Sequence, residues 1–144
     1  MDKRNAEGYY DPTAYNALTE IMKDERKAAY KPLVYICSPF RGDTKRNMFK
    51  AREYCRFAIK NNCIPFAPHL LFPQFMNDED EKERELAMLF NKVFLCKCDE
   101  LWVFGSKVTE GMAHEITLAE KRRIKIIYFI EKMEVRDESN RNRI

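Results

Sequence analysis

Three short segments of the sequence carry residue types that could bind a ligand or take part in chemistry. The first is Ser-Pro-Phe-Arg-Gly-Asp-Thr at residues 38–44, between an apolar run and a stretch with helical spacing. Backbone N–H groups at such a helix start favour an anion, and Arg41 adds a planar fork suited to phosphate or carboxylate. The segment is neither a G-x-G-x-x-G nor a Walker loop, so a plain turn with an exposed arginine explains its spacing equally well.

The second segment is Pro-Phe-Ala-Pro-His-Leu-Leu-Phe at residues 65–72. Apolar and aromatic groups at the end of a strand could wall a pocket for a flat base, with His69 as a polar contact. The alternative is a structural loop that seals the core. We favour the structural loop for the aromatic side chains and the pocket for His69.

The third segment contains the best candidate catalytic residue, Glu115. This residue follows Met112 by three positions and precedes Ala119 by four, and both belong to the expected buried stripe of a helix. Glu115 is therefore expected at the inner edge of the helix, in its opening turns, where the dipole favours an ionised carboxylate. Thr109 can cap the helix or hold a ligand oxygen, and Gly111 allows close backbone approach. Because a lone helical glutamate usually faces solvent, this pattern alone favours a non-catalytic role.

Alternating strands and helices are expected to bring these segments together. Continuously apolar, β-rich runs predict strands over 33–37, 63–66, 101–105 and 124–130. Helical spacing predicts helices over 45–61, after the acidic run 78–85, and over 112–123, whereas 67–75 is expected to be a loop. The pattern is typical of an α/β fold with a doubly wound, mainly parallel sheet and helices on both faces. Ligands of such folds bind at the carboxyl ends of the strands.

The helix that follows the acidic run is expected to turn an apolar face toward the core. Its expected inner residues are Leu86, Leu89, Phe90, Val93 and Phe94. The acidic run itself is expected to be a solvated helix opening, because the helix dipole favours carboxylates there.

Length and composition suit one domain, which we place at residues 32–131. A helical arm is expected over 1–31, with a helix from Pro12 to about Ala29, and a loose charged tail over 132–144. Hydrophobic residues make up 45% and charged residues 34%, and no apolar run reaches the roughly 20 residues that span a bilayer. A cytoplasmic protein without a membrane partner is the expectation.

Charge and cysteine usage argue against two other classes of protein. The net charge of +3 is small and the charges are scattered, which disfavours a nucleic-acid partner. The five cysteines include a C-x-C at Cys96 and Cys98, but no second pair and no neighbouring histidine completes a zinc set. We expect structural thiols and no metal.

Taken together, the three segments resemble the nucleoside 2-deoxyribosyltransferase-like family, which includes 2′-deoxynucleoside 5′-monophosphate N-glycosidases. Residues 35–42, Tyr-Ile-Cys-Ser-Pro-Phe-Arg-Gly, are similar to the glycosidases' opening segment Y-x-C-G-S-I-R-G. His69 falls where those enzymes carry a histidine, and residues 99–115 resemble their run from an acidic residue to the nucleophilic glutamate. Phage and mobile-element proteins that share S-P-[YF]-R-G, P-H-x-x-F and C-D-E-L-W-V-F-G look closer still. The likeness covers roughly residues 33–130.

The resemblance implies an enzyme that cleaves a base–sugar bond. Glu115 would attack the anomeric carbon to form a glycosyl-enzyme, which water or a second base then resolves. The implied ligand is a small nucleoside or nucleotide, with no cofactor, and the implied assembly is a homo-oligomer of at least two copies. The implied substrate-binding residues are Tyr35, Ser38, Phe40, Arg41, Gly42, His69, Thr109, Gly111 and Met112. Of these, Arg41, the backbone around Ser38, Thr109 and Gly111 would hold a 5′-phosphate.

Asn91 marks the main departure from the glycosidases, which carry an aspartate eight residues before the position of Asp99. An amide cannot donate a proton as a carboxylic acid does, so Asn91 is a catalytic position without an acid. A leaving group that is already cationic, such as nicotinamide in NAD, needs no acid, and an NAD-type glycohydrolase is therefore one alternative. A non-catalytic nucleotide-binding module is another. Pro39, in place of a serine, also removes a backbone donor from the first loop.

Overall fold

The computed structural model describes residues 12–135. The chain separates into two compact units, Met1–Lys31 and Pro32–Ile144. The described residues of the first unit form helix α1 (Pro12–Ala29), on which Leu18 and Ile21 are exposed. The part of the expected arm before residue 12 lies outside the described residues. None of the helices between residues 12 and 135 combines the length and the hydrophobicity that a bilayer-spanning helix requires.

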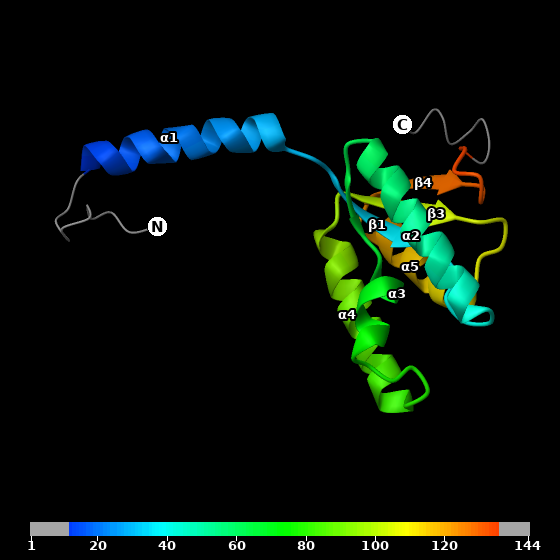
Figure 1. The fold of residues 1–144 in the computed structure, drawn as a ribbon. Coiled ribbons are helices and arrows are strands. Elements are labelled where there is room, and N and C mark those ends of the chain that lie inside the picture. Colours follow the sequence, from blue (N-terminus) through cyan, green and yellow to red (C-terminus); the bar gives the residue numbers. More distant parts are fainter. Residues whose placement is uncertain (1–11, 136–144) are drawn as a thin grey trace. The chain divides into compact units, whose positions relative to one another are not determined.

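The second unit is built on a parallel sheet of four strands. These are β1 (Leu33–Cys37), β2 (Ile64–Phe66), β3 (Glu100–Phe104) and β4 (Lys125–Phe129), in the order β2-β1-β3-β4 (Figure 1). Tyr35 in β1 is aligned with Phe66 in β2 and with Leu101 in β3. The two central strands, β1 and β3, are therefore covered along both edges as well as on both faces, which explains why they read as unbroken apolar runs.

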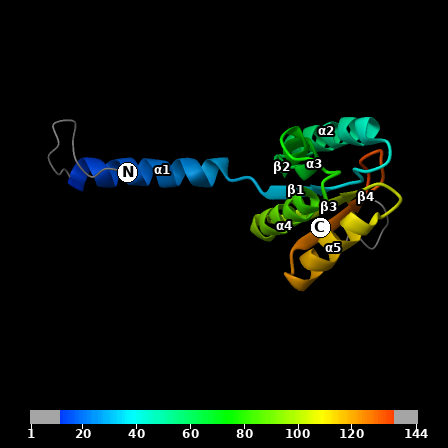
Figure 2. The same cartoon turned by 90° about the horizontal axis from the view of Figure 1, so that it is seen from below.

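Helices cover both faces of this sheet (Figure 2). Helix α2 (Thr44–Lys60) lies on one face, and α4 (Glu81–Lys97) and α5 (Glu110–Lys121) lie on the other. Side chains of successive strand residues point to opposite faces, so each strand supplies both cores. The sequence prediction of a doubly wound α/β fold is confirmed.

The two cores differ in composition. The core under α2 is aromatic: the Tyr54 and Phe104 rings stack with centroids 4.0 Å apart, and Phe129 stacks on Phe104 at 5.0 Å. The core under α4 and α5 is aliphatic and sulfur-rich, with Leu95 and Met112 as its largest helix residues. Tyr35 is the one fully buried tyrosine of this second core, and its phenol oxygen has no hydrogen-bond partner.

The prediction of a loop over 67–75 is wrong. The chain forms a short helix, α3 (Pro68–Leu71), followed by a 3₁₀ turn, η1 (Phe72–Gln74). Pro68 begins α3, where its missing N–H and fixed φ fit the first helical position. The two prolines of this stretch therefore start helical turns, and the segment presents its side chains as a wall.

The predicted inner face of α4 is also wrong for most of its residues. Leu86, Leu89 and Val93 are exposed, by 44–54%, and the fully buried residue of the helix is Leu95. The prediction holds better for Phe94, whose ring stacks on Phe66 of β2 with centroids 4.4 Å apart. The two sides of α4 are both apolar, so helical spacing identifies apolar faces without showing which one meets the sheet. Leu86, Leu89 and Val93 form a stripe on the side opposite Leu95, which we call the outer stripe of α4.

The chain beyond β4 turns back on the sheet. Val135 forms an isolated antiparallel bridge with Phe129, and Met133 and Val135 pack against the aromatic core. The ordered chain thus continues past residue 131. Residues 136–144 of the expected tail lie outside the described residues.

Candidate functional site

A cavity of about 290 Å³ opens at the carboxyl ends of the central strands. Its floor is formed by the segment after β1 and by the first turns of α5, and its walls are formed by α3, η1 and α4. This volume is close to the lower end of the range, about 300 Å³ and upward, in which small-molecule sites are found. The position is the one that doubly wound sheets use for ligands.

The structure brings most of the sequence-predicted site residues together around this cavity. Nine line it: Ser38, Phe40, Arg41, His69, Asn91, Thr109, Gly111, Met112 and Glu115. Tyr35 lies beneath them, fully buried in β1. Gly42 does not reach the cavity; its φ of +98° makes it a turn residue, because L side chains rarely adopt that conformation.

Glu115 lies at the floor of the cavity beside Tyr35. Burial raises the pKa of Glu115 to about 7, and the Tyr35 hydroxyl, a potential donor, lowers it. Burial and the Glu115 carboxylate together hold the pKa of Tyr35 well above its usual value, so the phenol stays protonated. The pair falls short of full hydrogen-bond geometry, since neither Tyr35 Oη nor Glu115 Oε2 has a partner. Glu115 therefore exchanges protons near neutral pH.

Four buried side-chain atoms within residues 12–135 lack a hydrogen-bond partner, and all four belong to this site. They are Tyr35 Oη, Ser38 Oγ, Asn91 Oδ1 and Glu115 Oε2. Buried polar atoms in folded proteins are almost always paired, with protein, water or ligand. These unpartnered atoms are therefore concentrated in and beneath the lining of one cavity.

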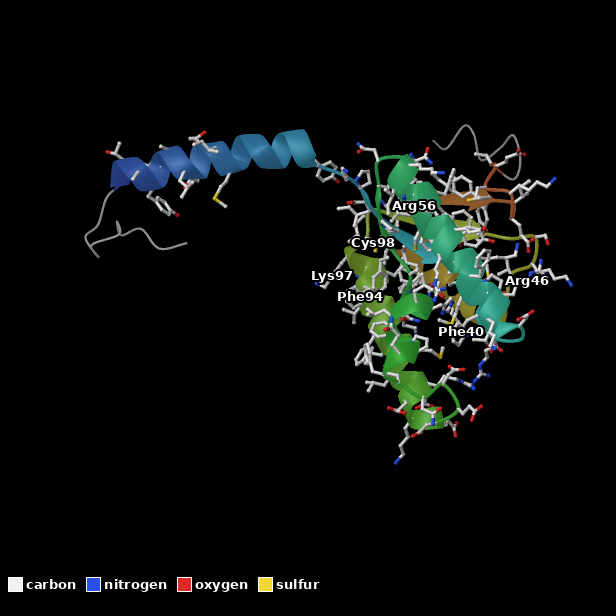
Figure 3. The ribbon with its side chains drawn as sticks, in the orientation of Figure 1. Phe40, Arg46, Arg56, Phe94, Lys97 and Cys98 are labelled. Carbon is white, nitrogen blue, oxygen red and sulfur yellow. The ribbon has the colours of Figure 1, made fainter. Side chains whose placement is uncertain are left out.

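His69 closes the cavity above the first loop. Its Nε2 lies 2.9 Å from the Ser38 carbonyl oxygen, and its ring packs on Phe40 with centroids 4.8 Å apart. Figure 3 shows Phe40 between α3 and the start of α2. Burial lowers the pKa of His69. Because a carbonyl oxygen only accepts, a neutral His69 donates through Nε2 and keeps Nδ1 as an acceptor.

The first loop is held by the start of α2. Asn47 donates from Nδ2 to the carbonyl oxygens of Phe40, at 3.0 Å, and of Arg41, at 3.2 Å. Asp43 caps the helix, its Oδ1 accepting from the Arg46 N–H at 3.2 Å. The loop backbone is therefore fixed before any ligand binds. Likewise, Thr109 Oγ1 accepts from the Met112 N–H at 3.3 Å and caps α5, as expected.

Several residues of the cavity were missed by the sequence interpretation. Arg84, Ala87 and Met88 lie on the same side of α4 as Asn91 at helical spacing, and this spacing could have placed them beside the predicted Asn91. Asp78 could not have been found in this way. It lies in the turn before α4 and accepts from Arg41 Nε at 3.0 Å, across 37 residues of sequence.

Charges of both signs line the cavity. The cations are Arg41, Arg84 and Lys92, and the anions are Asp78, Glu83, Glu110 and Glu115. Within the described part of the chain, no three His, Cys, Asp or Glu side chains gather as metal ligands. The five cysteines are free thiols, and in the C-x-C pair Cys98 is buried whereas Cys96 is exposed.

Comparison with known proteins adds the fold relationship. A family model described as "Domain of unknown function (DUF7768)" matches residues 32–129. A structure of a 2-deoxyribosyltransferase from the psychrotolerant bacterium Bacillus psychrosaccharolyticus matches with a TM-score of 0.59 and 12% identity, covering 78% of this chain and 82% of the other. A conserved protein from Enterococcus faecalis V583 matches with a TM-score of 0.50 and 21% identity, covering 69% and 64%. A sequence search of curated proteins finds no match. At these identities the two structures establish a shared fold.

Proposed function

Since residues 32–129 make this chain a member of the family described as a domain of unknown function, DUF7768, we propose its function from the site itself. The proposal is an enzyme that cleaves the base–sugar bond of a nucleoside or nucleotide, as a hydrolase or a deoxyribosyltransferase. Glu115 is the proposed nucleophile. The fold shared with a 2-deoxyribosyltransferase agrees with this chemistry, and the arrangement of the cavity supports it further.

The observation that carries the proposal is the set of unpartnered atoms around Glu115. A nucleoside offers hydroxyl groups on the sugar and N–H or carbonyl groups on the base, which match the hydroxyl, amide and carboxylate side chains of Ser38, Asn91 and Glu115 in the cavity lining. The apolar wall made by Phe40, Phe72 and Met88 suits the faces of a flat base. The polar floor and the apolar wall thus correspond to the two halves of such a molecule.

The proposed reaction begins with the ionised form of Glu115. A carboxylate oxygen bonds to the anomeric carbon while the carbon–nitrogen bond breaks and its electron pair leaves with the base. The Tyr35 hydroxyl stabilises the ionised carboxylate of Glu115 before it attacks. In the second step the oxygen of water, or the nitrogen of another base, bonds to the same carbon, Glu115 departs as a carboxylate, and the incoming group loses a proton to solvent.

Asn91 favours a second candidate for the leaving group. Asn91, at the position where the resemblance implies a general acid, is a primary amide with an unpartnered, buried Oδ1, which accepts a hydrogen bond but cannot act as a carboxylic acid. A leaving group that is cationic in the substrate, as nicotinamide is in NAD, departs without protonation. An NAD-type glycohydrolase therefore fits Asn91, and a non-catalytic nucleotide-binding module fits it too.

A release assay separates these candidates. The wild type is incubated with nucleosides, their 5′-monophosphates and NAD, and free base is measured by chromatography. We expect release by the wild type and loss of about 10³-fold or more in Glu115→Ala, as for removal of a covalent nucleophile. Glu120→Ala, on an exposed position of the same helix, is the matched control. If both the wild type and Glu115→Ala bind a ligand without releasing base, the protein is a nucleotide-binding module and the enzyme hypothesis is wrong.

We also propose that the protein assembles with a second copy of itself through α4. The outer stripe, Leu86, Leu89 and Val93, leaves three large apolar side chains exposed on one side of the helix. Contiguous exposed apolar patches are a feature of protein–protein interaction sites. Asn91, on another side of α4, would then be supported by a helix that is packed on both sides.

A further inference from the structure

Arg41 already holds an anion that belongs to the protein. Its Nε donates to Asp78 Oδ2 at 3.0 Å, and its Nη2 donates to the Asp78 backbone oxygen at 3.4 Å. The two side chains remain 58% and 38% exposed, so the pair contributes little to stability. The effect of the pair is electrostatic. A ligand that approaches the Arg41 guanidinium also approaches the Asp78 carboxylate, so the positive charge that it meets is offset.

The turn that carries Asp78 is fixed in place. The Asn77 N–H donates to Glu83 Oε2 at 3.1 Å, and the Glu79 N–H donates to Asn77 Oδ1 at 3.0 Å. Asp80 then caps α4 by accepting from the Lys82 N–H. Asp78 is thus presented to Arg41 by a structured turn.

The first loop and the two helix starts at the site also offer less to an anion than their position suggests. The start of α2 is capped by the carboxylate of Asp43, and Pro39 contributes no N–H to the loop. Glu110 brings a carboxylate to the first turn of α5 at the cavity. A phosphate dianion beside Arg41 would meet the Asp78 carboxylate, in a cavity that Glu110 also lines, and like charges at close range oppose binding.

We infer that Asp78 is a specificity-determining residue, which by pairing with Arg41 makes the site prefer an unphosphorylated nucleoside to its 5′-monophosphate. Asp78 engages Nε and one hydrogen of Nη2, and a guanidinium has five N–H donors in all. The others can donate to a neutral hydroxyl oxygen without a change of charge. This inference rests on the proposed function, because it assigns the chemical class of the ligand of the same site.

The test is ligand binding, measured by calorimetry for the four common 2′-deoxynucleosides and their 5′-monophosphates. Glu115→Gln serves as the background, so that turnover does not consume the ligand. We expect at least one nucleoside to bind about fivefold or more tightly than its monophosphate. When Asp78→Asn is added, the affinity for the monophosphate should increase about tenfold, and the affinity for the nucleoside should change by less than about twofold. Glu79→Gln, which removes a neighbouring charge in the same turn, should leave the ratio unchanged.

The possible outcomes test the role of Asp78 and the proposed function separately. Tighter binding of a monophosphate than of its nucleoside, or an unchanged ratio in Asp78→Asn, overturns the role of Asp78 and leaves the proposed function standing. Binding of neither class overturns the proposed function and the inference with it. Asp78→Ser provides a second neutral variant if Asp78→Asn does not fold, as judged by circular dichroism.

Discussion

The Tyr35 phenol and the Glu115 carboxylate meet beneath the cavity, one from the central strand β1 and the other from the second turn of α5. Each alters the protonation of the other: the carboxylate raises the pKa of Tyr35, and the hydroxyl lowers the pKa of Glu115. Because β1 and α5 are both anchored in the core, neither side chain depends on a surface loop for its place. The first two predictions follow from this pair.

The pH dependence of base release should report the ionisation of Glu115. With a pKa of about 7, the nucleophilic form is lost as pH falls through neutrality, so the rate should drop about tenfold per pH unit below about pH 6. Tyr35→Phe removes the hydroxyl that lowers this pKa, and the acidic limb should move to higher pH. Tyr54→Phe, in the core on the opposite face, is the control and should not move it. A limb that stays in place in Tyr35→Phe contradicts the coupling.

The stability of the fold should also depend on Glu115. A carboxyl whose pKa is raised in the folded state binds more protons there than in the unfolded chain, so stability falls as pH rises from about 4.5 to about 7. The loss is on the order of 3 kcal/mol. Glu115→Gln should abolish this loss of stability. In urea unfolding, the free energy of unfolding of the variant should therefore increase relative to that of the wild type between pH 5 and pH 8. Parallel profiles for the two proteins would show that the carboxyl is not buried.

Asn91→Asp should reveal which leaving group the site serves. A carboxylic acid at this position can protonate a neutral base, and general acids typically accelerate such steps by about 10²-fold or more. Base release from nucleosides should therefore increase, whereas release of nicotinamide from NAD should not. Asn91→Ala separates acid chemistry from mere loss of the amide. If Asn91→Asp leaves the rate of nucleoside cleavage unchanged, protonation of the leaving base by residue 91 is not the step that limits the reaction.

Asn47 should support ligand binding through the first loop. Asn47→Ala removes the donor that holds the Phe40 and Arg41 carbonyls, with an expected loss of about 1–2 kcal/mol of stability and about tenfold in nucleoside affinity. Asn61→Ala is a matched control, because Asn61 also donates its side-chain amide to a backbone carbonyl, that of Phe57, at the other end of α2. Equal losses of affinity in both variants would attribute the effect to the helix rather than to the loop.

The outer stripe of α4 should determine assembly. Leu89→Glu introduces a charge where Leu89 is 54% exposed, and a dimer held there should dissociate in analytical ultracentrifugation. Ile59→Glu places the same charge at a similarly exposed apolar position on α2 and should leave assembly intact. A wild type that sediments as a monomer at all concentrations would remove the proposed interface.

Local sequence patterns predict the sheet well and the walls of the cavity poorly. The strands at 33–37 and 100–104 are continuous apolar runs because both faces of β1 and β3 are buried, and their order with the helices predicts the fold. In contrast, the prolines at 68 and 73 resemble loop residues, although each begins a helical turn. A proline is compatible with both states, and the sequence does not show which neighbours hold it.

The site could be predicted where its residues follow strand ends and not where it depends on contacts far apart in sequence. Ser38 follows a strand end, and His69 and Glu115 lie in the opening turns of helices, and the parallel topology brings such positions together. The pairing of Arg41 with Asp78 depends on how the turn before α4 is placed, which no local pattern encodes. The apolar face that α4 turns away from the sheet was misassigned for the same reason.

The floor and the walls of the cavity are formed by different parts of the chain. Tyr35 and Glu115 belong to elements buried with the sheet, whereas α3, η1 and the first turns of α4 belong to the connection between β2 and β3, which rejoins the core at Leu95. Substitutions at exposed positions of this connection are expected to leave the packing of β1 and α5 intact. Selectivity can therefore evolve, or be engineered at the exposed positions among residues 74–88, without changing Tyr35, Asn91 or Glu115.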